Sequence, residues 1–87
     1  MENPGRRTII TLTVNVLLDD IDFATIEIFR RFRSKGLRVH QVRSILEYEG
    51  INLGYGQVRY RLQHLSFVGI ITREKGNHYD RYYLNVM

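Results

Sequence analysis

The most constraining feature of the sequence is residues 39–74, where two helical patterns are joined by a short turn. In the second pattern, residues 55–68, Val58, Leu62 and Leu65 are spaced at i, i+4 and i+7, so they share one helix face. The opposite face and its flanks carry these residues: Gly56, Gln57, Arg59, Tyr60, Gln63 and His64. Arginine, glutamine and tyrosine can read base edges and bind phosphates, although any exposed helix face must be polar.

The first pattern, residues 40–49, predicts a shorter helix whose inward positions are Val42, Ile45 and Leu46. Gly50 ends this helix, and Gly54 opens the next one, since an N-cap position tolerates glycine. The turn between the two glycines is partly apolar. Two short helices joined in this way have the layout of a helix-turn-helix.

An earlier helix is predicted over residues 19–35. Asp19 is its N-cap, Asp22 follows three residues later, and both acids suit the positive end of a helix. Gly36 ends the helix. The inward positions are Ile21, Ala24, Thr25, Ile28, Phe29 and Phe32. The basic residues of its last turns are Arg30, Arg31, Arg33 and Lys35, and we favour a role in complementing the helix dipole over direct DNA contact for most of them.

Residues 70–86 are predicted to form a hairpin after Gly69 breaks the preceding helix. Leu37 and Val39 are predicted to form a very short strand or entry segment. The pair Gly76-Asn77 between two β-rich runs predicts the turn, which places Lys75 near the tip. Three helices followed by a hairpin predict an α+β winged helix-turn-helix, as one domain over residues 8–87.

The same turn and helix carry a longer pattern of matching residues: Gly50, Ile51, Asn52, Leu53 and Gly54, then Val58, Arg59, Tyr60 and Leu62, and finally Gly69, Ile70 and Ile71. This pattern resembles the winged-helix domains of archaeal nitrogen regulators and of ribonuclease R, and it covers about half of the chain. Gln57 departs from the usual Thr or Ser. Gly56 lies within the first turn, where glycine lowers helix stability by roughly 0.8–1 kcal/mol relative to alanine. Either a close approach of the backbone to DNA or a later helix start would explain a glycine at this position.

The N-terminal part is predicted to be an arm followed by a strand. Residues 1–7 are a flexible arm. Thr8 starts an alternating, β-branched strand and Leu17 ends it, so one face of residues 8–17 is apolar. Pairing with the same strand of a second chain would bury its edge and give a homodimer. Pairing with the C-terminal hairpin is the alternative, and the sequence does not separate the two.

Charge is unevenly distributed along the chain. The net charge is +4, and eleven of the thirteen basic residues are arginine, whose planar fork suits phosphate and guanine. The acids gather at Asp19, Asp20, Asp22 and Glu27, whereas most bases lie elsewhere. Such a field suits an anionic partner.

Several other classes of protein are disfavoured. The chain has no cysteine, no apolar run long enough to cross a bilayer and no signal-peptide pattern, so we expect a cytoplasmic protein that is nucleoid-associated when bound to DNA. His40, His64 and His78 lack the spacing of a metal site. We find no phosphate-cradling loop and no nucleophile with a base. We therefore expect no catalytic residue, no cofactor and no small-molecule ligand.

The sequence thus predicts a sequence-specific regulator that binds double-stranded DNA. The residues assigned to base or near-base contacts are Gln57, Arg59, Tyr60 and Gln63. Those assigned to phosphates or base edges are Tyr55, Arg43 and His64. Arg73 and Lys75 of the wing are assigned to the adjacent backbone or minor groove. Arg61 lies at the border of the buried face, where a surface salt bridge is its simplest role.

Two other functions remain open at this point. The same face could dock an acidic protein partner instead of DNA. The tyrosines suggest RNA, since Tyr79 and Tyr83 could stack bases, although packing of Tyr82 and Tyr83 against the helices is the favoured explanation for the tyrosines of the hairpin.

Overall fold

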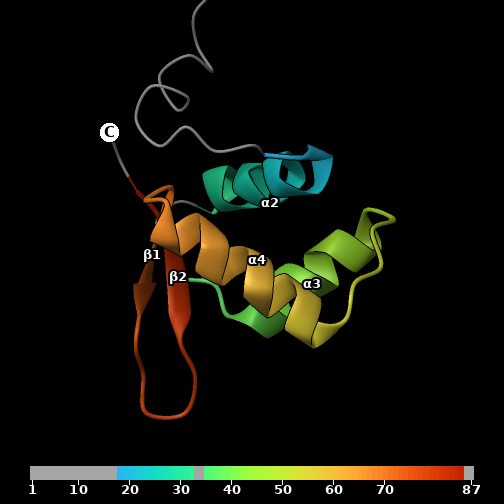
Figure 1. Cartoon of the computed structure of the whole chain (residues 1–87). Coiled ribbons are helices and arrows are strands. Elements are labelled where there is room, and N and C mark those ends of the chain that lie inside the picture. The colour runs from blue at the N-terminus through green and yellow to red at the C-terminus, as the bar shows by residue number, and fades with distance from the viewer. Residues whose placement is uncertain (1–17, 33–34, 86–87) are drawn as a thin grey trace, which may run out of the picture.

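The computed structural model describes residues 18–32 and 35–85 and has the predicted winged-helix architecture. The helices are α2 (Asp20–Arg31), α3 (Val39–Tyr48) and α4 (Tyr55–Phe67), and the strands are β1 (Ile71–Glu74) and β2 (Arg81–Leu84). In Figure 1 the hairpin extends on the left, at the opposite end of the domain from the α3–α4 turn. The predicted arm (1–7) and strand (8–17) lie outside the described residues.

One hydrophobic core joins all three helices and the hairpin. The predicted face of α4 is buried at Val58, Leu62 and Leu65, and so are Val42 and Leu46 of α3. The other core residues are Ile28, Phe29, Leu37, Val39, Ile71 and Tyr82. Each large side chain buried in this way contributes about 1.5–3 kcal/mol through removal from water, which fixes the orientation of α4 and leaves its opposite face exposed.

Helix α2 begins as predicted and ends earlier. The Asp19 carboxylate accepts a hydrogen bond from the Asp22 amide (2.8 Å), and the Asp22 carboxylate accepts one from the Asp19 amide (3.1 Å). This reciprocal cap confirms Asp19 as N-cap. The helix ends at Arg31, not residue 35, so Gly36 does not terminate it. Phe32 has left helical geometry (φ −117°) and is 38% exposed, so its predicted inward position is wrong.

The helix-turn-helix turn is confirmed, with its predicted glycines at both ends, although α3 ends at Tyr48 and not at residue 49. Helix α3 begins one residue before the predicted start and is followed by Gly50, whose φ of +91° is strained for residues with a side chain. The Ile51 amide donates to the Leu46 carbonyl (2.8 Å), and Gly54 is the N-cap of α4. Because α4 already starts at Tyr55, the idea of a helix start later than Gly56 is wrong.

The wing differs from the predicted tight hairpin. Its strands pair antiparallel from Ile71↔Leu84 to Glu74↔Arg81, so residues 75–80 form a longer connection in place of a two-residue Gly-Asn turn. Two contacts draw the chain away from the ladder. Arg73 forms an ion pair with Asp80, and the ring of Tyr79 turns toward α3.

Leu37 forms a third, very short strand beside the hairpin. Its amide donates to the Tyr82 carbonyl (2.9 Å), and the Tyr82 amide donates to the Leu37 carbonyl (2.8 Å). This bridge confirms the predicted strand or entry segment at Leu37, whereas Val39, the other residue assigned to it, is the first residue of α3. It also fixes the wing against the start of α3, so the two elements border α4 together.

Candidate nucleic-acid interface

The exposed face of α4 lies between two hollows that differ in charge. We name the first the wing cleft, about 110 Å³ in volume, and it is lined by Arg38, Val39, His40, Tyr55, Arg59, Tyr79, Asp80 and Tyr82. We name the second the acid hollow, about 500 Å³ in volume, and it is lined by Asp19, Asp22, Leu53, Gly56, Gln57, Tyr60, Arg61 and His64. The two hollows place the flanks of one helix in opposite electrostatic surroundings.

A stack of side chains organises the wing cleft. The guanidinium of Arg38 lies over the Tyr79 ring, 4.5 Å from its centroid, and that of Arg81 lies 5.3 Å from the same centroid. Arg81 also donates a hydrogen bond to the Tyr79 hydroxyl (3.1 Å). Because an aromatic face attracts a cation, Tyr79 holds the side chain of Arg38 at the boundary between α3 and the wing.

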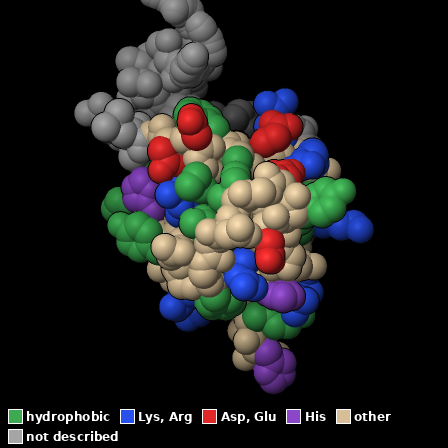
Figure 2. Space-filling model, turned by 90° about the vertical axis from the view of Figure 1, so that its right-hand side faces the viewer, with side chains coloured by type: hydrophobic (Ala, Val, Ile, Leu, Met, Phe, Trp, Pro, Cys, Tyr) green, Lys and Arg blue, Asp and Glu red, His purple; other side chains and the backbone are tan. Residues whose placement is uncertain are grey.

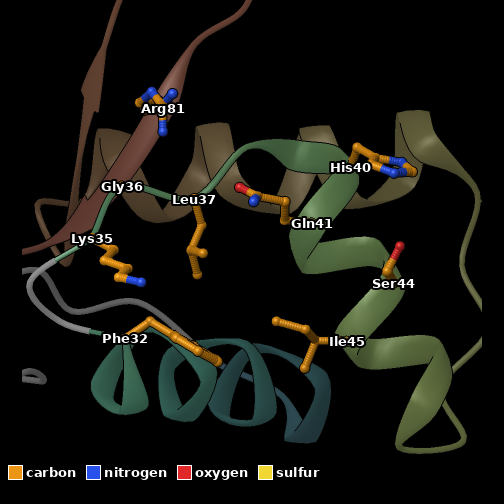
Figure 3. A pocket seen from close by; sticks show the side chains of 9 residues that line it. All are labelled: Phe32, Lys35, Gly36, Leu37, His40, Gln41, Ser44, Ile45 and Arg81. Atoms are coloured by element: carbon orange, nitrogen blue, oxygen red, sulfur yellow. The ribbon is translucent and has the colours of Figure 1, made fainter.

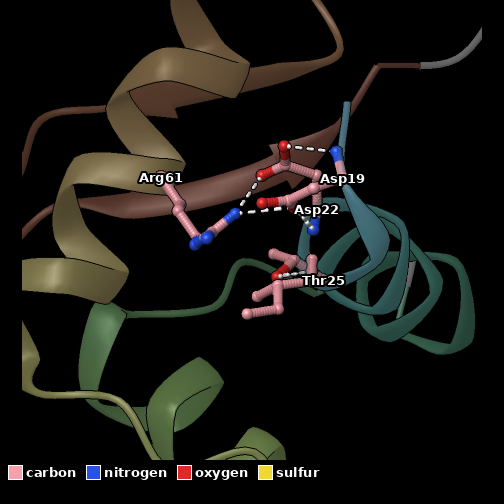
Figure 4. A network of polar contacts seen from close by, with 5 residues as sticks. Asp19, Asp22, Thr25 and Arg61 are labelled. Atoms are coloured by element: carbon pink, nitrogen blue, oxygen red, sulfur yellow. Dashed lines mark hydrogen bonds and ion pairs between the residues drawn. The ribbon is translucent and has the colours of Figure 1, made fainter. Parts of the chain in front are cut away.

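The acid hollow contains an ion-pair network that joins α2 to α4. One nitrogen of the Arg61 guanidinium lies 2.8 Å from the Asp19 carboxylate and 2.9 Å from that of Asp22 (Figure 4). We name this group of three residues the α2–α4 clamp. Asp22 is almost fully buried, and Thr25 below it donates its hydroxyl to the Ile21 carbonyl. The predicted salt bridge of Arg61 is therefore confirmed.

The clamp shifts the protonation of its own members. The hydrogen bond from Arg61 and then that from the Asp22 amide lower the pKa of Asp19 from 3.8 to about 2. The hydrogen bond to Asp19 raises the pKa of Arg61 above its ordinary value. Asp19 and Arg61 are therefore ionised at neutral pH, and the guanidinium of Arg61 lies against the carboxyl groups of both Asp19 and Asp22.

The remaining arginines divide in the same way. Across residues 18–32 and 35–85, ion pairs involve Arg30, Arg31, Arg61 and Arg73, and none involves Arg38 or Arg59. Figure 2 shows acidic side chains mainly toward the upper part of one face, whereas Lys, Arg and His also cover the lower part. Arg38 and Arg59, which line the wing cleft, thus have no ion pair with a described residue, whereas Asp80 of the same cleft is paired with Arg73.

The structure divides the recognition residues that the sequence predicts on α4. Tyr55 and Arg59 line the wing cleft, whereas Gln57, Tyr60 and His64 line the acid hollow. The Gln57 side-chain oxygen accepts a hydrogen bond from the Gly54 amide (2.8 Å), so it caps its own helix. Gln63 lies between the two flanks and is half-buried.

The predicted residues outside α4 have different surroundings. The Arg43 guanidinium donates to the Leu53 carbonyl (3.2 Å), which ties α3 to the turn. Arg73 is paired with Asp80 at 2.7 Å, and Lys75 is exposed in the connection of the wing. Arg43 and Arg73 therefore already have structural partners.

Sequence reasoning missed Arg38 and the role of Tyr79 beside it. Arg38 is the N-cap of α3, where its amide donates to the Gln41 side chain (2.9 Å). An arginine is a poor N-cap because its side chain cannot accept a hydrogen bond. That mismatch between residue and position was the one local signal for another role.

A third hollow, which we name the back groove, is lined by the segment between α2 and α3, by α3 and by β2, and by no described residue of α4. Its volume is about 610 Å³, and it is lined by Phe32, Lys35, Gly36, Leu37, His40, Gln41, Ser44, Ile45 and Arg81. Figure 3 shows Phe32, Leu37 and Ile45 around its interior. Arg81 lines this groove and is not among the residues that line the wing cleft, to which it is joined by its hydrogen bond to the Tyr79 hydroxyl.

Two other features, a cluster of metal ligands and a membrane-spanning helix, are absent from residues 18–32 and 35–85. No group of three or more His, Cys, Asp or Glu side chains within these ranges is placed to hold a metal ion. None of the helices in this part of the chain is long and apolar enough to cross a membrane.

The fold resembles solved structures of a bacterial regulator, although no family model and no curated protein matches the sequence. The ferric uptake regulator of Francisella tularensis, solved with iron, is 27% identical over 80% of this chain and 54% of its own, with a TM-score of 0.72. That of Vibrio cholerae, whose structure reveals a rearrangement of its DNA-binding domains, is 13% identical over 94% of this chain and 63% of its own, with a TM-score of 0.78. This chain thus spans less than two thirds of either regulator, and the likeness confirms the winged-helix fold.

Proposed function

We propose that this chain is a DNA-binding module of a transcriptional regulator, which places α4 in the major groove of duplex DNA and the wing along the adjacent backbone. The main observation in support of this function is the pair of arginines on the wing side of α4 that lack ion pairs within the described part of the chain. There Arg59 and Arg38 come from different elements and border one cleft, with no ion pair to any described residue. Uncompensated arginines beside an exposed helix are the electrostatic footprint of a nucleic-acid partner.

Two further observations support duplex DNA over RNA. The Tyr79 ring is already covered by the Arg38 guanidinium, and the Tyr83 hydroxyl donates to the Glu74 carboxylate (3.0 Å). One face of the Tyr79 ring is therefore already occupied by a cation, and the hydroxyl of Tyr83 already has a partner within the wing, which leaves both tyrosines less suited to bases than free rings. The regulators that resemble this fold include one described as having DNA-binding domains.

The finer parts of the function are also proposals. Base-specific contacts are assigned to Arg59, Gln63 and the other predicted residues of α4. Dimerisation through residues 8–17 remains a prediction, because those residues lie outside the described part. The same holds for the resemblance to archaeal nitrogen regulators and ribonuclease R. The iron belongs to the Francisella protein, and the described residues of this chain do not offer a grouped set of ligands for it.

A protein partner is the second candidate, and one observation favours it. Tyr60 is 70% and Phe67 is 89% exposed on the outer side of α4. Exposed aromatic side chains are enriched at protein interfaces. This candidate predicts binding that depends little on nucleic acid.

The deciding experiment is fluorescence anisotropy of three labelled pools, duplex DNA, single-stranded DNA and RNA, across a salt series. We expect preference for the duplex pool and an affinity that falls steeply as salt rises. Stronger binding to either single-stranded pool would favour RNA or single strands. No binding to any pool at low salt would overturn the proposed function in favour of the protein partner.

A further inference from the structure

Tyr82 is the most deeply buried tyrosine of the described residues, and it is one of the residues that line the wing cleft. Tyr82 is 1% exposed, and no described residue forms a hydrogen bond with its hydroxyl. The charged groups that act most strongly on this hydroxyl are Arg73 and then Asp80, which are paired with each other, followed by Arg59. Asp80 and Arg59 line the same cleft. Buried polar groups are almost always hydrogen-bonded, so the expected acceptor of the Tyr82 hydroxyl lies outside residues 18–32 and 35–85, and a bound ligand can supply it.

The charge of the cleft selects the kind of acceptor. Asp80 is the one carboxylate among the described residues that line it, and it is already paired with Arg73 at 2.7 Å. The other charged groups at its wall are the guanidinium groups of Arg38 and Arg59. Burial raises the pKa of the Tyr82 hydroxyl, so this group remains a proton donor at neutral pH. Donors and cations around a small cleft suit an anion with oxygen acceptors.

The position of the cleft identifies the anion. A helix in the major groove is bordered on each side by a phosphate backbone, because the groove is only about 12 Å wide. The cleft opens between the first turn of α4 and the wing. A backbone strand that borders the groove on the wing side therefore passes over the cleft.

We propose that the wing cleft binds one backbone phosphate of duplex DNA, with Arg38 and Arg59 as the cations and the Tyr82 hydroxyl as a hydrogen-bond donor. This inference rests on the proposed function and deepens it. Tyr79 is a positioning residue, because its ring holds the Arg38 guanidinium and its hydroxyl accepts from Arg81. A held guanidinium loses less side-chain freedom when it binds phosphate.

The first test is Arg38→Ala, measured by anisotropy on fluorescein-labelled duplexes of random sequence between about 50 and 200 mM salt. We expect affinity to fall about three- to tenfold for all sequences alike, and the slope of log affinity against log salt to fall by about 0.9, the value for one phosphate. The matched control is Arg30→Ala on α2, which removes the same charge from an exposed residue paired with Glu27. We expect the control to leave the slope unchanged.

The second test is Tyr82→Phe, which removes the hydroxyl and keeps the packing of the ring. We expect unchanged or higher thermal stability and about tenfold weaker duplex binding, the loss of one hydrogen bond to a charged group. Unchanged affinity in Tyr82→Phe would overturn the role of the hydroxyl. This variant also keeps the cleft testable if Arg38→Ala does not fold.

The third test separates positioning from packing at Tyr79. Tyr79→Phe keeps the stacked ring, whereas Tyr79→Leu removes it. If the two variants melt at the same temperature, we expect Tyr79→Leu to have a salt slope close to that of Arg38→Ala, because no aromatic ring then holds the guanidinium. We expect Tyr79→Phe to keep the salt slope of the wild type. If the wild type binds duplex DNA and Arg38→Ala matches Arg30→Ala in affinity and slope, the cleft proposal is wrong while the proposed function stands. If the wild type binds no duplex, the proposed function itself fails.

Discussion

The two flanks of α4 use arginine in opposite ways. On the α2–α4 clamp side, Arg61 lies against two carboxylates and its charge is offset within the protein. On the wing side, Arg38 and Arg59 border a cleft whose one described carboxylate is paired elsewhere. Residue type alone does not distinguish the two groups, since all three are arginines within or next to the helix-turn-helix. Their partners do, and this assigns a structural role to the first flank and a binding role to the second.

The contrast also indicates how DNA would approach. Asp19 is exposed beside the acid hollow and ionised at neutral pH, so it repels phosphates on that side. The wing side attracts them. We therefore expect the duplex to lie toward the wing, so that Arg59 is better placed for a base edge than Gln57, whose side-chain oxygen caps its own helix.

The largest effect that we predict is on stability, in Arg61→Ala. The substitution leaves the nearly buried Asp22 carboxylate without its cation, and we expect the free energy of unfolding to fall by about 2–3 kcal/mol. Urea denaturation followed by circular dichroism measures it. The control Arg30→Ala breaks an exposed pair at 3.8 Å and should change stability by less than about 0.5 kcal/mol. A stable Arg61→Ala protein that binds DNA poorly would reverse the roles of the two flanks.

The second effect is on binding, in Arg59→Ala. We expect the free energy of specific duplex binding to weaken by about 1–3 kcal/mol, with relaxed base preference at the contacted position. Anisotropy on a duplex chosen by in vitro selection, together with variants of its sequence, measures both quantities. The free energy of unfolding should stay near that of the wild type, because the Arg59 side chain is exposed. Unchanged affinity and preference would remove Arg59 from the interface.

The sequence was sufficient where the structure is determined locally. The spacing of Val58, Leu62 and Leu65 predicted the buried face of α4, and Gly50 and Gly54 predicted the bounds of the turn. Periodicity and glycine act within one element or one turn, so no tertiary information was needed.

The sequence was insufficient where distant elements meet. Arg61 and Asp19 are 42 residues apart, and only packing of α2 against α4 reveals that they pair. Arg38 and Tyr79 likewise come from α3 and the wing. The wing turn was predicted too tight. Tyr79 contacts Arg38 outside the wing, and Asp80 pairs with Arg73 of β1 beyond the end of the ladder. Phe32 was placed in the core by extending a helical pattern beyond Arg31, the last residue of the helix.

The third effect is a dependence of stability on pH that comes from Asp19 in the α2–α4 clamp. The pKa of Asp19 is about 2 in the folded protein, below its ordinary value of 3.8. The ionised form therefore stabilises the fold above about pH 4, and this contribution is lost as the pH falls through about 2. Asp19→Asn keeps an N-cap residue and removes the charge. We expect it to be less stable than the wild type at neutral pH and the two stabilities to converge toward pH 2 in urea denaturation. Parallel curves would show that the clamp does not depend on this charge.

The smallest effect is expected in Gly56→Ala, beside the acid hollow. An ideal Cβ at this position meets nothing within 4 Å, so the methyl group fits, and we expect a gain of about 0.5–1 kcal/mol in the free energy of unfolding. Because the duplex is expected on the wing side, its affinity should stay within about twofold of the wild type, a change of less than about 0.5 kcal/mol. Anisotropy and urea denaturation on one preparation measure both. A more stable protein with about tenfold weaker binding would place DNA backbone against Gly56, and the acid hollow would then lie inside the interface despite its carboxylates.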